Sequence, residues 1–282
     1  MKLCRYGEKG QERPGLVDKN GMIRDLSAHL ADINAQALDP KSLAAIAALS
    51  IAILPVVPGS PRLGIPVTRT SKYIAIGLNY RDHAEEASLA IPTEPLIFLK
   101  AINCLSGPND DIIQPPHSTK LDWELELGVV IGSKAQYVDE PKALDYVAGY
   151  CIANDVSDRG FQFQSSQWAK GKGCDSFGPI GPWLVTKDEV PNPQNLDMWL
   201  EVNGQRRQTG NTANMIFSVA QIVAYCSRYM TLLPGDVICT GTPPGVGMGT
   251  KPEPIWLKPG DAVHLWIDGL GEQRQTVVAY NP

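Results

Sequence analysis

The chain has 282 residues, of which 43% are hydrophobic and 20% are charged, so it can bury a large core and has room for a small domain beside a larger one. Its formal net charge of −5 and the lack of a Lys/Arg cluster argue against a nucleic-acid-binding protein. The six cysteines show no Cys-x-x-Cys spacing, which favours reduced thiols over a disulfide framework or a zinc site.

The first residues contain no apolar run typical of a secretory signal. The most apolar segment, 43–57, is interrupted by Ser50 and Pro55, whereas a membrane span needs about 18 uninterrupted apolar residues. We therefore expect a cytoplasmic protein with no membrane-spanning segment.

The leading part of the chain has the pattern of a small separate unit. Short strand-like segments at 2–6, 15–17 and 22–25 precede a predicted helix at 41–49. Proline and glycine then crowd into 55–66, which predicts a boundary there. We expect a small N-terminal domain over residues 1–65 and a larger domain over 66–282.

The larger unit is rich in predicted strands. They lie at 73–78, 96–100, 123–131, 146–153, 183–186, 198–202, 237–240, 262–267 and 275–279, with turns at Asn203-Gly204 and Asp268-Gly269. A helix-compatible segment covers 79–90, and Ser218 to Gln221 is a capping box that opens a helix with an apolar stripe for the core. Many strands without βαβ alternation predict a mixed, largely antiparallel sheet rolled or packed on itself.

The most informative strand is 123–131. Its leucines occupy one face and Glu124 and Glu126 the other, the alternation typical of a half-buried strand. Neighbouring positions on one face lie roughly 6.6 Å apart, so both carboxylates can reach one hard cation. Asp155, at the end of another predicted strand, adds a third carboxylate. Such a set suits Mg²⁺ or Mn²⁺, and Ca²⁺ also tolerates it; a polar face that only meets water is the alternative for the glutamate pair.

Three other segments contain candidate functional groups. His83 and Glu86, at i and i+3, form either a general base with its orienting carboxylate or a surface ion pair. Lys172 lies in a predicted loop, where lysines are ordinarily solvated. The glycine-rich segment 240–249 matches neither phosphate-binding motif. Its backbone N–H groups and the Thr242 hydroxyl could hold a substrate carboxylate, or the segment is a structural turn.

Six segments taken together resemble the fumarylacetoacetate hydrolase family. They are 77–86, 95–100, 123–132, 147–157, 172–179 and 235–247. The resemblance implies an α+β, mainly β fold: a mixed β-roll or sandwich catalytic domain, commonly homodimeric. Residues 1–65 resemble the small N-terminal domain of longer bacterial members, including those labelled 2,4-diketo-3-deoxy-sugar-acid hydrolases or ureidoglycolate lyases.

The resemblance also implies roles for residues at the matching positions. The expected set is Mg²⁺ or Mn²⁺ held by Glu124, Glu126 and Asp155, a His83/Glu86 dyad on a lid helix, an active-site lysine at Lys172, substrate contacts at Gln162 and Thr242, and basic side chains lining the site at Arg159 and Lys100. No organic cofactor is expected.

The chemistry that unites these groups is carbon–carbon bond hydrolysis in a 2,4-dioxo acid, such as an acylpyruvate or a diketo-deoxy sugar acid. A metal would stabilise the enolate, and the dyad would activate water. A lyase of the same family, acting as a ureidoglycolate lyase, a decarboxylase or a hydratase, is the first alternative. A non-catalytic paralogue that binds a 2-oxo acid is the second.

Overall fold

A long sheet forms the centre of the fold in the computed structural model, which describes residues 1–86 and 90–282. In spatial order its strands are β3 (Ile23–Asp25), β2 (Arg13–Val17), β1 (Lys2–Tyr6), β12 (Gly178–Thr186), β10 (Val147–Asn154), β9 (Leu125–Ile131), β15 (Val237–Cys239), β4 (Tyr73–Gly77) and β5 (Leu96–Lys100), with β6 (Leu105–Ser106) paired to β12. Most pairs are antiparallel, but β15 pairs with β4 and β12 with β6 in parallel.

A second sheet contains β14 (Gln205–Asn211), β13 (Asp197–Val202), β16 (Ala262–Ile267), β17 (Gly271–Ala279) and β7 (Ile112–Gln114) in that order. β8 (Leu121–Asp122) and β11 (Ser157–Asp158) form a small third sheet. No sheet closes into a barrel within the described ranges. The predicted fold class, mainly β with mixed sheets and few helices, is confirmed.

The helices are short. They are α1 (Pro40–Ala47), α2 (Arg81–Glu86), α3 (Arg159–Gln162), α4 (Ala169–Lys172) and α5 (Val219–Tyr229). The predicted capping box on α5 is confirmed, because the Ser218 hydroxyl accepts from the Gln221 N–H and the Gln221 side chain accepts from the Ser218 N–H. Among the described residues, no helix has the length and apolar character that crossing a membrane requires.

Several predicted boundaries were wrong for identifiable reasons. Strand β12 begins at Gly178 rather than 183, because glycine and proline mask its first half. Strand β17 begins at Gly271 rather than 275, because glycine and polar residues mask its first half. The polar strand β14 was missed, although the Asn203-Gly204 turn that joins it to β13 was predicted. The helix predicted over 79–90 is described only as α2, and residues 87–89 lie outside the described part of the chain.

The largest correction concerns the strand with the two glutamates. It begins at Leu125, so Glu124 precedes β9, and all seven of its residues are buried instead of one face meeting water. The reason is its central position: β10 and β15 flank it in the sheet, and β13 of the second sheet packs against it. The face that bears Glu126 is therefore an interior surface.

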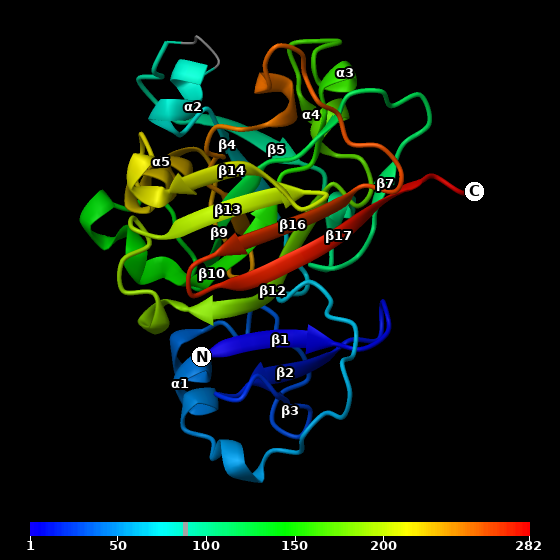
Figure 1. The fold of residues 1–282 in the computed structure, drawn as a ribbon. Helices are drawn as coiled ribbons and strands as arrows, with labels where there is room; N and C mark the ends of the chain where they lie inside the picture. Colours follow the sequence, from blue (N-terminus) through cyan, green and yellow to red (C-terminus); the bar gives the residue numbers. More distant parts are fainter. Residues whose placement is uncertain (87–89) are drawn as a thin grey trace.

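The strands of residues 1–65 extend the central sheet, because β1 pairs with β12 through Lys2 and Leu3. Figure 1 shows this N-terminal part at the lower end of the molecule, where β1, β2 and β3 continue the central sheet, with α2, α3 and α4 at the opposite end. The domain boundary near residue 65 stays a prediction, since the backbone pairing joins the two parts in one sheet.

Candidate active site

Strand register brings the three predicted ligands together. In the antiparallel pair of β9 and β10, Glu126 lies opposite Ala153. Two residues further along, the Asp155 N–H donates to the Glu124 carbonyl oxygen over 2.9 Å. Positions that face each other across antiparallel strands point their side chains to the same side of the sheet. Ligand oxygens of Glu124, Glu126 and Asp155 consequently lie within 4.8 Å of one another, and all three side chains are buried.

Three buried cations surround these acids. Lys172 Nζ lies 2.6 Å from Glu124 Oε2 and 2.7 Å from Asp155 Oδ2, so the ammonium bridges two of the carboxylates. Arg159 Nη2 lies 2.5 Å from Glu124 Oε1. Lys100 Nζ donates to the other Asp155 oxygen and, over 3.2 Å, to the Val156 carbonyl.

Glu124 and Glu126 experience opposite electrostatic environments. Burial raises the pKa of Glu126 well above its usual value, and the nearby charges of Asp155 and Glu124 raise it further. Burial also acts to raise the pKa of Glu124, but Lys172 and Arg159 outweigh it and hold that pKa far below its usual range. Of these two glutamates, Glu126 is thus the one that binds a proton more readily.

The glycine-rich segment that follows β15 donates its backbone N–H groups to the protein's own carboxylates. Gly241 N donates to Glu126 over 2.6 Å, and Gly245 N donates to Glu86 over 3.0 Å. The Thr242 hydroxyl donates to the Leu125 carbonyl over 2.8 Å, so it fastens the segment to β9. A substrate contact for Thr242 stays a prediction.

Positive φ angles shape this segment. Gly241 has a φ of +96°, and Gly245 has a φ of +100°. A Cβ on Gly245 would lie 1.9 Å from the Arg207 carbonyl oxygen, so only glycine fits there. The turn that presents the Gly245 N–H to Glu86 therefore depends on that residue.

His83 and Glu86 lie on α2 as the sequence predicted, with His83 Nδ1 3.1 Å from Glu86 Oε2. Because Glu86 also accepts from Gly245, its carboxylate is held from two sides. The side chains are only partly exposed, at 13% for His83 and 24% for Glu86. The arrangement differs from an open surface ion pair, which was the alternative.

A cavity of about 240 Å³ connects the dyad with the acids. Of the predicted site residues, the side chains that line it are His83, Glu124, Glu126, Asp155, Arg159, Gln162, Lys172 and Thr242. Lys100 and Glu86 are not among the lining residues: Lys100 lies behind Asp155, and Glu86 lies behind His83. Lys172 is the last residue of α4 instead of a loop residue.

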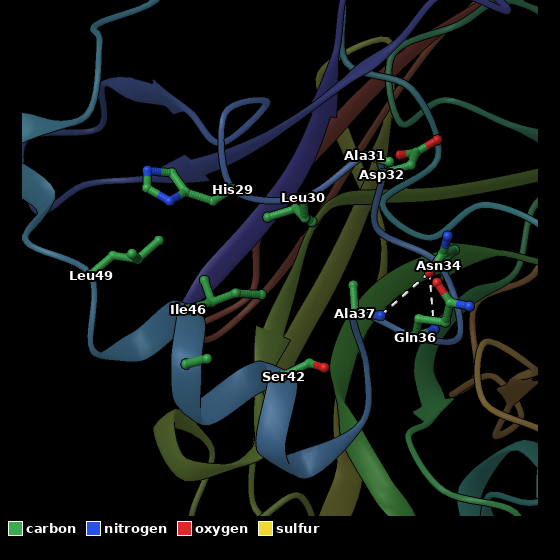
Figure 2. Close-up of a pocket in the computed structure, with 11 residues that line it drawn as sticks. His29, Leu30, Ala31, Asp32, Asn34, Gln36, Ala37, Ser42, Ile46 and Leu49 are labelled. Atoms are coloured by element: carbon green, nitrogen blue, oxygen red, sulfur yellow. Dashed lines mark hydrogen bonds between the residues drawn. The ribbon is translucent and has the colours of Figure 1, made fainter.

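A roomier cavity of about 380 Å³ lies in the N-terminal part, between α1 and the segment 29–37 (Figure 2). Its lining includes His29 and Asp32, but the Asp32 carboxylate already pairs with Arg5 over 2.7 Å. The dashed lines in Figure 2 mark hydrogen bonds that the backbone N–H groups of Gln36 and Ala37 donate to the Asn34 side chain. None of the predicted site residues lies there, so the smaller cavity is the candidate active site.

Two buried residues that support the site were missed. Asp122 accepts from Arg159 Nε over 2.8 Å and from the Gly247 N–H over 2.6 Å, so it holds both Arg159 and the glycine-rich segment. Gln208 accepts from the Leu125 N–H and donates to the Thr242 hydroxyl. Asp122 was within the acidic segment, where its position beside Glu124 was a usable signal, whereas nothing near Gln208 pointed to the site.

The sequence profile described as fumarylacetoacetate (FAA) hydrolase, C-terminal, matches residues 72–278. This match covers well over half of the chain and includes every predicted site residue. The chain belongs to the fumarylacetoacetate hydrolase family. A protein of Burkholderia ambifaria that carries only a provisional hydrolase name is 60% identical over 277 residues, which cover 98% of each chain.

Solved structures of the fumarylacetoacetate hydrolase family agree with the fold. A maleylpyruvate hydrolase from Sphingobium sp. SYK-6, in complex with a manganese(II) ion and pyruvate, superposes with a TM-score of 0.84 at 30% identity over the whole of both chains. A 2-hydroxyhepta-2,4-diene-1,7-dioate isomerase from Mycobacterium marinum superposes with a TM-score of 0.75 at 32% identity, also over both whole chains. One of these relatives is named a hydrolase and the other an isomerase. Membership of the family therefore supports the prediction that this protein is an enzyme, but it does not select the reaction.

Proposed function

We propose that this protein is a divalent-metal-dependent hydrolase that cleaves a carbon–carbon bond in a 2,4-dioxo acid. The observation that carries the proposal is the single cavity shared by three buried carboxylates and His83. A binding protein would need the carboxylates but would not need an imidazole oriented by a carboxylate. This argues for catalysis over the non-catalytic alternative.

The donor set fits a hard divalent ion. All the available ligand atoms of Glu124, Glu126 and Asp155 are carboxylate oxygens, which Mg²⁺ and Mn²⁺ prefer and Ca²⁺ accepts. A manganese(II) ion occupies the structure of the Sphingobium relative. When bound, such an ion supplies a Lewis acid that stabilises negative charge on a 2-oxo acid.

The charge of the cluster also supports this assignment. Four buried carboxylates, those of Asp122, Glu124, Glu126 and Asp155, face only three buried cations, those of Lys100, Arg159 and Lys172. One negative charge therefore lacks a counterion among these groups. The pKa of Glu126 is raised first by burial and then by the neighbouring charges of Asp155 and Glu124. A divalent ion would change the balance to one positive charge, which the carboxylate of a 2-oxo acid would neutralise.

The chain's own groups suit the proton transfers of hydrolysis. With Nδ1 hydrogen-bonded to Glu86, His83 has Nε2 available to take a proton from water, which then attacks the 4-carbonyl carbon. The bond between C3 and C4 then breaks, and its electron pair passes to C3 as the enolate of the 2-oxo acid half. The proton taken up by His83 passes to C3 and completes the reaction. Lys172 and Gln162 would stabilise the oxyanion that forms at C4.

We assign the remaining predicted residues as follows. Arg159 and Thr242 line the cavity and are proposed substrate contacts. Lys100 is buried and donates to Asp155, so we propose that it positions this ligand instead of touching substrate. The N-terminal part, residues 1–65, is proposed to be a structural extension of the sheet.

The decisive experiment incubates the purified full-length chain and Mg²⁺ or Mn²⁺ with acylpyruvates, a diketo-deoxy sugar acid, oxaloacetate, ureidoglycolate and a 2-hydroxydienoate, and follows the products by NMR. We expect an acylpyruvate to yield pyruvate and a carboxylic acid. Loss of CO₂, release of urea or isomerisation without cleavage would each establish the corresponding alternative in place of hydrolysis.

A further inference from the structure

One side of strand β5 leads from the acid cluster to the mouth of the cavity. Lys100, Phe98 and Leu96 alternate onto the same face of the strand. Lys100 contacts Asp155, the Phe98 ring lies 5.2 Å from Lys172 Nζ, and Leu96 is 42% exposed at the rim. The four residue steps from Lys100 to Leu96 span about 13 Å, so this face can contact parts of a substrate that lie well beyond its 2-oxo acid group.

An aromatic side chain completes this wall. The rings of Phe98 and Trp168 meet edge to face with centroids 5.2 Å apart. Gly77, opposite Leu96 on β4, lets these side chains pack directly over its backbone: a Cβ there would lie 2.8 Å from Leu96 Cδ2 and 3.0 Å from the Trp168 ring. Phe98, Trp168 and Leu96 all line the cavity, and the part of it that they bound is here called the acyl slot. A larger residue at 77 would displace Leu96 and Trp168 from this wall.

The rest of the cavity mouth is also apolar, since Leu78, Phe163 and Met248 contribute to its lining. The arginine and lysine side chains that line the described cavity are those of Arg159 and Lys172, and both are bonded to Glu124 at the inner end. A negative charge in the acyl slot would lose water without gaining an ion pair there.

We propose that the substrate's acyl group is an uncharged, apolar chain or ring that lies in the acyl slot. This inference rests on the proposed function and narrows it, because it disfavours both a polyhydroxylated sugar-acid tail and a tail that ends in a carboxylate. Each methylene that leaves water in the slot contributes about 0.8 kcal/mol, which is about fourfold in kcat/KM.

The test measures kcat/KM of the Mn²⁺-loaded full-length enzyme for three substrates. They are acetylpyruvate, pentanoylpyruvate and glutarylpyruvate, the last of which carries a terminal carboxylate. We expect kcat/KM for pentanoylpyruvate to exceed both other values by about tenfold or more. Equal values, or a preference for glutarylpyruvate, would overturn the acyl slot while leaving the hydrolase assignment intact. If the enzyme consumes none of the three, the proposed function fails, and this inference fails with it.

A matched pair of variants on β5 tests whether the acyl slot causes the preference for an uncharged acyl group. Leu96→Lys adds a cation at the acyl slot, whereas Leu99→Lys adds one on the opposite face of the same strand, at a residue that is 50% exposed and outside the cavity lining. We expect Leu96→Lys to shift the glutarylpyruvate to pentanoylpyruvate ratio of kcat/KM about tenfold toward glutarylpyruvate, since it both attracts the carboxylate and removes apolar contact. The Leu99→Lys ratio should match the wild type; equal shifts in both variants would contradict the inference.

Discussion

At the scale of single residues, Glu126 is unusual because it has no salt bridge among the described residues although it lies in a buried cluster of acids. Its counterion in our proposal is the divalent metal. Replacing it by glutamine removes a ligand charge and keeps the shape of the side chain. We expect Glu126→Gln to abolish metal-dependent turnover and to weaken Mn²⁺ binding by at least about tenfold, as measured by calorimetry.

The same variant should remain folded, because it removes one of three neighbouring negative charges from the interior. Circular dichroism and the melting temperature without metal provide this check. Glu253→Gln, at an exposed position, is the control and should keep full activity. An active Glu126→Gln enzyme that turns over substrate after metal removal would refute the assigned centre.

His83 permits a complementary experiment, since it lines the cavity but is not one of the three clustered ligands. We expect His83→Ala to bind Mn²⁺ with unchanged affinity and to lower kcat by about 10²–10⁴-fold, because water attack loses its base. Steady-state kinetics and calorimetry on the same sample measure the two effects separately.

The control for this variant is His29→Ala, in the N-terminal part of the molecule, which should retain the wild-type kcat. Wild-type turnover by His83→Ala would show that another group activates the water. Loss of Mn²⁺ affinity in His83→Ala would instead place the imidazole among the metal ligands.

At the scale of structural elements, Arg62 connects the N-terminal part with the loop that precedes β7. Its Nη2 lies 2.6 Å from Asp110 Oδ2, and its Nη1 lies 2.9 Å from Glu12 Oε1. Burial opposes ionisation of Asp110, but Arg62 outweighs it and lowers the pKa of that carboxyl. We expect Arg62→Gln to lower the free energy of unfolding by about 1 kcal/mol at pH 7, measured by urea denaturation.

The pH dependence of this effect has a definite sign. A carboxyl whose pKa is lowered in the folded state stabilises the fold above its unfolded pKa, about 3.9 for aspartate, and loses that contribution as pH falls through the folded pKa. The difference between Arg62→Gln and wild type should therefore be constant from about pH 5 to 7 and shrink below about pH 4. Arg13→Gln, which breaks a more exposed pair with Asp25, should cost less than about 0.5 kcal/mol.

At the scale of the whole molecule, metal binding should stabilise the entire fold. The proposed ligands come from β9, the residue before it and the residue after β10, and they are together only in the folded chain. At a free Mn²⁺ concentration of 100 times Kd, the expected gain is about 2.7 kcal/mol. Thermal unfolding with and without EDTA measures it. A melting temperature that does not respond to Mn²⁺ or Mg²⁺ would contradict the site.

The family resemblance also predicts a homodimer. β3 and β5 end the central sheet. The outer edge of β3 is covered by the segment 55–57, because the Asp25 N–H donates to the Pro55 carbonyl and the Val57 N–H donates to the Ile23 carbonyl, each over 2.9 Å. The outer edge of β5 has no strand partner in the described part of the chain, so this edge can pair with a second copy. Light scattering should give a mass of twice 30.6 kDa over a range of protein concentrations. A mass of 30.6 kDa throughout would show that the chain is a monomer.

The sequence by itself determined the local features of this protein: the type of most strands, the capping box of α5, the Asn203-Gly204 turn and the pairing of His83 with Glu86 on one helix. These features depend on residues close together in the chain, where hydrophobic periodicity and turn chemistry act directly. The family resemblance extended this to the acids of the proposed centre.

Only the tertiary structure decided which charges meet. Lys172 bridging two of the acids, Lys100 behind Asp155 and Asp122 holding Arg159 all join segments distant in sequence. The burial of both faces of β9 and the acyl slot between β5 and Trp168 also arise from packing between elements. Periodicity reports which face of a strand is apolar, but it does not report what covers the other face, and here that cover creates the site.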